Sequence, residues 1–129
     1  MENPLSSVQI HLKTSVAHLS NREHPDYRNS IKEAISAVEE LCQKITGAKL
    51  TLGYALGKIE KKSSIKIPIP MRIAFGKLYG YTNTSEGIRH TLNDIPDLQR
   101  EDAMFMLVSC SATVIYLTAK ADKAGITLM

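Results

Sequence analysis

Apolar residues recur every three or four positions along most of the chain, which is the spacing of one face of an α-helix. In residues 5–20 these positions are Leu5, Val8, Leu12, Val16 and Leu19. In the next segment they are Tyr27, Ile31, Ala34, Ile35, Val38, Leu41, Cys42 and Ile45. Asp26 precedes this second run, where its side chain can cap a helix, and Gly47 follows it, where a left-handed residue can end one. The pattern predicts two helices joined by a polar turn.

The middle of the chain predicts shorter elements. Helical spacing indicates a third helix over residues 50–61 and a fourth that runs from Met71 to a stop at Gly80. Between them, residues 65–71 alternate like a strand, but two prolines remove backbone donors, so we interpret this segment as an extended connector. A polar loop then leads into a short helical turn, residues 88–94, which a following proline must stop.

The last predicted helix is capped by Asp97 and is the least polar part of the chain. Residues 103–119 contain no charged side chain and nearly reach the length of a membrane span. Four hydroxyl residues dilute this run, and Asp102 and Lys120 bracket it closely, which favours a central helix buried on most sides over a transmembrane one. Because a chain this small offers few partners for such a helix, a homodimer formed through it is a reasonable hypothesis.

These elements predict an all-α protein, an antiparallel helical bundle of about five helices. At 129 residues, with 43% hydrophobic and 22% charged residues, the chain fits one globular domain spanning residues 1–129. Two cysteines, Cys42 and Cys110, fit a reducing compartment, and the first residues lack the features of a secretory signal. We therefore expect a cytoplasmic protein without a membrane partner, and the sequence leaves open whether further domains belong to it.

Positive charge is concentrated in residues 44–77, which hold eight basic residues and one acidic residue, whereas each flanking segment is net negative. Such a local excess attracts polyanions, and nucleic acid is the commonest of these. A solvated lysine-rich surface would give the same pattern. The residues that we expect to bind nucleic acid are Lys58, Lys61, Lys62, Arg72 and Lys77.

The most suggestive chemistry lies in the turn GIRHTLND, residues 87–94. Arg89 and His90 stand near a predicted helix start, where free amide groups favour a phosphate. On a helix, Asp94 would share a face with His90 and could make that imidazole a better base. The alternative is a packed histidine beside a solvent-facing arginine.

A second candidate pair lies on the second predicted helix. Arg28 and Glu39 are eleven residues apart, which brings them to within about 20° of the same direction. Glu39 should be partly buried and would want a cationic partner such as Arg89, and a purely structural ion pair is the favoured interpretation. The remaining histidines, His11, His18 and His24, are interpreted as surface residues that form no metal site with the cysteines. The sequence contains no dinucleotide fingerprint, so we expect no metal and no cofactor.

Three segments carry a resemblance to a known family: DYRNSIKEAISAVEELCQKITG, KLYGYTNTSEGIRHTLND and MFMLVSCSATVIYLTAK. Together with the step from Ser36 to Glu39, they resemble the HEPN superfamily, specifically its abortive-infection-type members. The resemblance spans residues 26–120 and implies a helical bundle that dimerises around a polar cleft. It further implies a role in phage defence or stress response, with a fused or neighbouring defence domain as a partner.

The resemblance leaves two functions open. Many HEPN proteins are metal-independent endoribonucleases, in which an arginine is followed after four to six residues by a histidine. Here Arg89 and His90 are adjacent instead. We therefore favour a module that dimerises and binds RNA or nucleotide phosphate. The alternative is a ribonuclease in which His90 deprotonates a ribose 2′-hydroxyl and Arg89 stabilises the phosphate, supported by Arg28, Glu39 and Asp94.

Overall fold

The protein is all-α, as the hydrophobic pattern predicts. The computed structural model describes residues 3–48, 57–59, 65–80 and 97–128, and contains no strand within these ranges. Its helices are α1 (Ser6–Ser20), α2 (Tyr27–Thr46), α4 (Ile69–Gly80) and α6 (Arg100–Lys123). Residues 57–59 are also helical, inside the range predicted for the third helix.

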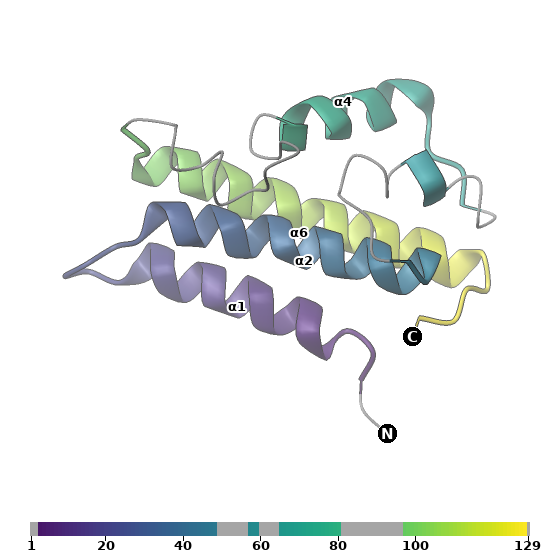
Figure 1. The fold of residues 1–129 in the computed structure, drawn as a ribbon, viewed down its shortest axis with the longest axis horizontal. Helices are drawn as coiled ribbons and strands as arrows, with labels where there is room; N and C mark the ends of the chain where they lie inside the picture. The colour runs from purple at the N-terminus through teal and green to yellow at the C-terminus, as the bar shows by residue number, and fades with distance from the viewer. Residues whose placement is uncertain (1–2, 49–56, 60–64, 81–96, 129) are drawn as a thin grey trace.

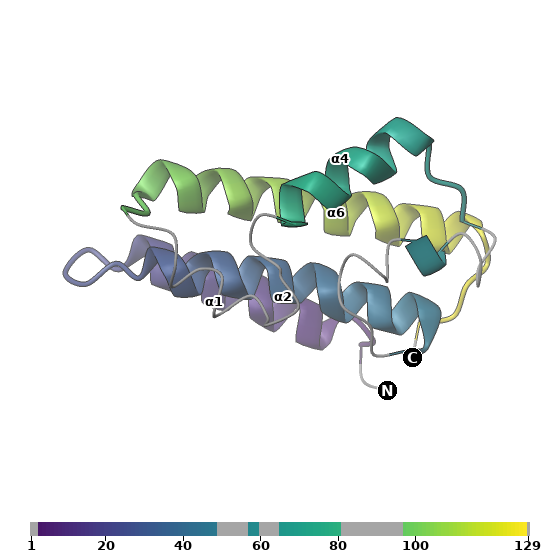
Figure 2. The same cartoon turned by 45° about the horizontal axis from the view of Figure 1, so that its top comes forward.

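Helix α2 is the centre of the arrangement, with α1 packed along one side and α6 along another. Helix α1 runs antiparallel to α2, whereas α2 and α6 run in the same direction, so their last turns lie at the same end of the molecule (Figure 1). Helix α4 returns antiparallel to α6 and lies on it, away from α1 (Figure 2). The edge-to-face contact of Phe75 with Tyr116 joins α4 to α6.

Helix α2 forms as predicted at both ends and along its face. The Asp26 carboxylate accepts a hydrogen bond from the Asn29 backbone N–H at 3.1 Å, and Gly47 ends the helix with φ of 73°. Burial alone would raise the pKa of Asp26, but the hydrogen bonds from Asn29 outweigh it and lower that pKa. The predicted apolar positions from Ile31 to Ile45 are buried in the core.

Two predicted boundaries are wrong, and both errors concern helix starts. Helix α6 is capped by Gln99 rather than Asp97: the Asp102 carboxylate accepts from the Gln99 backbone N–H at 2.9 Å in a reciprocal capping box. Asp97 instead has φ of 53° and lies outside the helix. The extended connector ends at Pro68, and α4 begins at Ile69, because a proline is tolerated in the first turn of a helix.

The last helix is buried on most sides, as predicted, but one side of it stays exposed. One side of α6 faces the core through Ala103, Met106, Cys110 and Leu117, all at most 1% exposed. On another side Phe105, Val108 and Ile115 are 58%, 60% and 71% exposed. By length and composition alone, α6 could cross a membrane. The described helices therefore leave an apolar side of α6 in contact with solvent.

Candidate functional site

The sequence places its strongest chemistry outside the described part of the protein. Arg89, His90 and Asp94 fall in residues 81–96, and Lys61 and Lys62 fall in residues 60–64. The predicted convergence of Arg89 and His90 with Glu39 therefore stays a prediction.

Arg28 and Glu39 are described, and they do not form a compact pair. Both lie on the same side of α2, but eleven residues of helix separate them by about 16 Å along the axis. Glu39 is partly buried, as predicted, and this burial raises its pKa, while the nearby charge of His11 acts in the opposite direction. A direct ion pair between Arg28 and Glu39 is excluded by this separation.

Neither cysteine is activated as a nucleophile. Burial raises the pKa of Cys42 to about 12, and the neighbouring charge of Glu39 adds to this effect. Burial likewise raises the pKa of Cys110 to about 12. The hydroxyl of Tyr79 lies 2.7 Å from the Thr113 hydroxyl, and burial raises its pKa as well. The thiols and the phenol stay protonated at neutral pH, so this buried group has a packing role.

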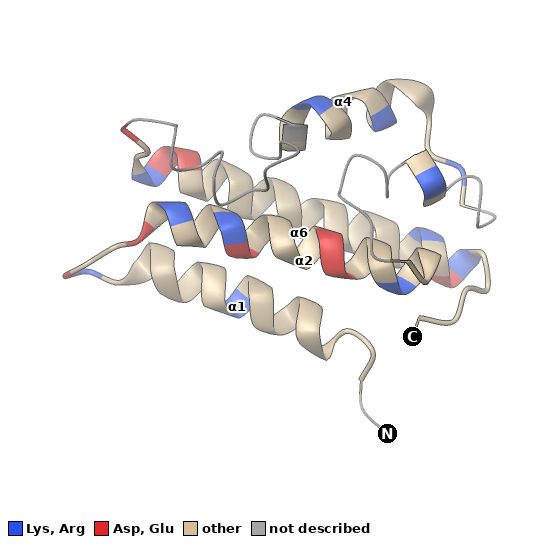
Figure 3. Ribbon diagram, viewed as in Figure 1, with Lys and Arg blue, Asp and Glu red and all other residues tan. Residues whose placement is uncertain are grey.

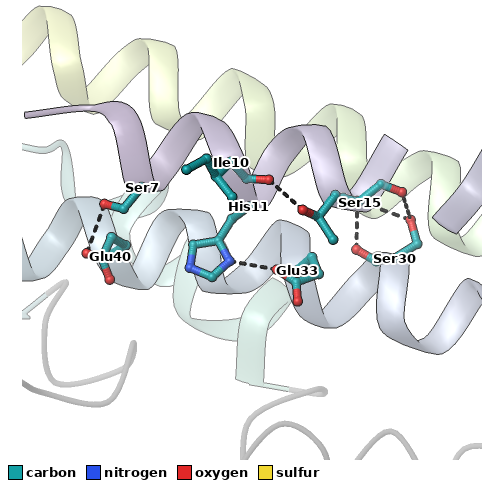
Figure 4. A network of polar contacts seen from close by, with 8 residues as sticks. Ser7, Ile10, His11, Ser15, Ser30, Glu33 and Glu40 are labelled. Carbon is teal, nitrogen blue, oxygen red and sulfur yellow. Dashed lines mark hydrogen bonds and ion pairs between the residues drawn. The ribbon is translucent and has the colours of Figure 1, made fainter. Parts of the chain in front are cut away.

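A polar network between α1 and α2 was missed by the sequence reasoning (Figure 4). His11, interpreted as a surface residue, is half-buried, and its Nδ1 lies 2.6 Å from a Glu33 carboxylate oxygen. The Ser7 hydroxyl donates to Glu40 at 3.0 Å. Two further serines bond across the same helix pair. The glutamates flank the apolar stripe of α2 at positions that sequence periodicity assigns to solvent, which is why their partners on α1 could not be foreseen.

Lysines gather where α2 and α6 end (Figure 3). Lys44 lies in the last turn of α2, and Lys120 and Lys123 lie in the last turn of α6. The segments 57–59 and 65–68, which carry Lys58 and Lys66, lie at the same end (Figure 1). We call these five residues the lysine end. Asp122 is the one carboxylate in the described segments that form it.

The lysine end overlaps only in part with the predicted nucleic-acid-binding set. Lys58 belongs to it. Arg72 and Lys77 are both on α4, but five residues of helix turn them about 140° apart, so they do not share one face. Lys120 and Lys123 were not predicted, because their sequence segment is net negative. The parallel course of α2 and α6 brings them to the basic stretch.

At the opposite end, a hollow of about 580 Å³ opens between the end of α1 and the start of α6. Val16, Leu19 and Leu107 give it an apolar lining. Arg22 and Arg100 also line it, and both are exposed. The surrounding surface mixes acidic and basic segments (Figure 3), in contrast to the lysine end.

No group of three or more metal-ligating side chains occurs among the described residues. In comparisons with known proteins, no family model, no curated protein and no solved structure matches this chain. Fold and surface chemistry thus define it as an all-α helical protein with one basic end.

Proposed function

We propose that this protein is a HEPN-like helical module that pairs with a second copy and binds RNA or nucleotide phosphate, within a phage-defence or stress-response system. The observation that carries the binding proposal is the lysine end, where described residues from three separated parts of the chain lie at the same end of the molecule: Lys44, Lys58 with Lys66, and Lys120 with Lys123. The family and the biological setting rest on the sequence resemblance alone.

The lysine end suits a phosphate backbone better than a neutral ligand. Among the described residues of this end, five ammonium groups stand against one carboxylate, and this excess creates a positive field that attracts a polyanion and favours release of its counterions. Lysines in the last turns also interact favourably with the partial negative charge of the helix C-termini. This interaction stabilises the fold even without a ligand. Salt dependence separates the two roles, since only phosphate contacts release counterions on binding.

The test is fluorescence anisotropy of a labelled single-stranded RNA titrated with the protein at several salt concentrations. The variant Lys66→Gln/Lys123→Gln removes two exposed charges from the lysine end. It should weaken binding. The negative slope of log K against log salt should become less steep by about two, one for each lost phosphate contact.

The matched control is Lys13→Gln/Arg22→Gln, which removes two exposed charges elsewhere. It should leave the affinity and the slope near those of the wild type. Equal losses in both variants would mean that net charge, rather than the lysine end, governs binding. Absence of RNA binding by the wild type at low salt would refute the proposal.

A second candidate, a metal-independent endoribonuclease, is favoured by the partly buried Glu39 carboxyl with its raised pKa, a property common at acid–base sites. In it His90 accepts the 2′-hydroxyl proton and Arg89 stabilises the phosphate charge, while Arg28, Glu39 and Asp94 orient them. Labelled RNA should be cut in the presence of chelator, and its 2′-deoxy analogue should not. Equal cleavage by wild type and His90→Ala, or none by either, would refute the nuclease.

A further inference from the structure

The exposed apolar side of α6 forms one continuous line. Its members are all exposed and are spaced alternately by three and four residues: Phe105, Val108, Ala112, Ile115 and Ala119. We call them the α6 stripe. This 3.5-residue repeat is the spacing at which one helix packs lengthwise against another. On a 24-residue helix of about 36 Å, the stripe occupies most of the length.

The described neighbours of α6 do not cover this stripe. The core side of α6 packs on α2, and the side carrying Thr113 and Tyr116 meets α4 through the contacts of Tyr79 and Phe75. The side carrying Met104 and Leu107 lines the hollow beside α1. The stripe lies between the α1 side and the α4 side. Three large apolar residues more than half exposed along one line are typical of an interaction surface.

We infer that the α6 stripe is the surface that binds a second copy of this chain. The α6 helices of the two copies pack antiparallel to each other around a twofold axis near Ala112. This inference rests on the pairing in the proposed function and adds its surface and its direction. A twofold axis uses the same stripe on both copies, so a self-complementary surface is required.

The sizes of the stripe residues fit an antiparallel pair. With the axis near Ala112, residues an equal number of positions before and after it face each other. The large Phe105 of each copy then meets the small Ala119 of the other, and Val108 lies near Ile115. Two Ala112 residues meet at the axis, where small side chains allow close approach.

The charges at the ends of the stripe also favour the antiparallel direction. Of the six charged residues of α6, Glu101 lies on the stripe direction and Lys123 within about 40° of it. Antiparallel packing places Glu101 of each copy near Lys123 of the other, whereas parallel packing would oppose like charges. Arg100 and Asp122 both lie toward the α1 side, and the same twofold axis brings these opposite charges together.

The first measurement is mass in solution by light scattering, at micromolar concentration and without RNA. The wild type should have twice the 14.3 kDa of one chain, and Ile115→Lys should have the mass of one chain. The matched control is Ile10→Lys, the same change at a similarly exposed position on α1, which should remain a dimer. A thermal melt checks that both variants fold. If Ile115→Lys does not fold, Val108→Lys replaces it.

The second measurement fixes the direction of packing. In Glu101→Cys/Lys123→Cys the two thiols of one chain are about 33 Å apart along α6, too far for a disulfide within the chain. Oxidation should link two antiparallel copies covalently, while Glu101→Cys alone and Lys123→Cys alone should not link. Efficient linking by either single variant would show a parallel pair and overturn the proposed direction.

The outcomes separate this inference from RNA binding. A wild type that is monomeric at tens of micromolar overturns the inference, even if it binds RNA. A dimer that Ile115→Lys disrupts supports it, even if the lysine end binds no RNA. A monomer that floats with phosphatidylcholine vesicles, and loses this property in Ile115→Lys, would assign the stripe to a membrane surface and overturn the inference.

Discussion

Helix α2 has two packed sides that are built from different chemistry. Its apolar face, with buried aliphatic residues such as Ile31 and Val38, belongs to the same hydrophobic core as the buried side of α6, on which α2 packs. Toward α1 it presents Glu33, Glu40 and other polar residues that bond to α1. The contact with α1 thus adds directional polar bonds to the hydrophobic burial that α1 contributes through Val8 and Leu19.

The difference teaches what each side contributes. Hydrophobic burial is roughly proportional to the area removed from water and has little directional preference, so the α2–α6 side supplies stability. Hydrogen bonds add less net free energy but require fixed geometry. The α1–α2 side therefore sets how α1 lies on α2.

The three polar pairs define one register between α1 and α2. Ser7, His11 and Ser15 are spaced by four residues on α1, and their partners on α2 follow in reverse order, as antiparallel neighbours must. A slip of α1 by one turn would break all three pairs at once. Val8 and Leu19 are the buried apolar residues of α1, so hydrophobic burial alone would distinguish only weakly between the native register and the slipped one.

The largest expected effect comes from the apolar side. Leu117 is completely buried on α6. Leu117→Ala removes apolar burial and leaves a cavity, so the free energy of unfolding should fall by about 2–5 kcal/mol. Urea denaturation measures this change. Ile10→Ala, at a position 61% exposed, should change it by less than about 0.5 kcal/mol, and equal losses would contradict the assignment of Leu117 to the core.

A smaller effect is expected on the polar side. The Ser15 hydroxyl donates to the Ser30 carbonyl at 2.7 Å, the Ser30 hydroxyl donates to the Ser15 carbonyl at 2.9 Å, and both residues are fully buried. Ser15→Ala should cost about 1–3 kcal/mol, because it leaves buried polar atoms of Ser30 without this partner.

A double-mutant cycle with Ser30→Ala tests whether these two serines act as a unit. The double variant should cost less than the two single variants together, because each single variant already removes the 3.1 Å contact between the two hydroxyls, which the double variant loses only once. Strict additivity would show that the two hydroxyls contribute independently and would weaken the view that this side sets register.

At the open end of the same side the effect should be smaller still. The Ser7 hydroxyl donates to Glu40 at 3.0 Å and is only partly buried, so water can replace this bond. Ser7→Ala should cost on the order of 0.5–1 kcal/mol. Ser6→Ala, on the neighbouring exposed residue, is the control in the same urea experiment. A loss as large as that of Ser15→Ala would contradict the gradient from buried to exposed polar pairs.

The contrast explains what the sequence could predict. The apolar face of α2 and its two caps follow from local spacing and from single residues, Asp26 and Gly47, and all are confirmed. The start of α6 could not be fixed this way, because both Asp97 and Gln99 can cap and the choice depends on the backbone around them. The polar register with α1 depends on long-range pairing, which periodicity does not encode.

The candidate surfaces likewise have one part that the sequence could predict and one part that depends on the fold. The basic stretch was visible as composition, but the arrival of Lys120 and Lys123 beside it depends on the parallel course of α2 and α6. The absence of charge in residues 103–119 predicted an apolar helix, yet a run without charges does not show which side is buried. The exposed line of Phe105, Val108 and Ile115 emerges only once three sides of α6 have neighbours.

The smallest expected effect concerns Glu39, a charged group beside the apolar core. Burial raises its pKa above the ordinary value of 4.5, so the folded protein binds its proton more tightly than the unfolded chain does. Its contribution to stability is therefore full below that ordinary value and is lost as pH rises through the raised folded pKa. Glu39→Gln, which cannot ionise, should be slightly more stable than the wild type at pH 7 and equally stable near pH 4. Urea denaturation at both pH values, with the exposed Glu23→Gln as control, measures the difference; a destabilised variant at pH 7 would mean that the Glu39 carboxylate is favourably paired.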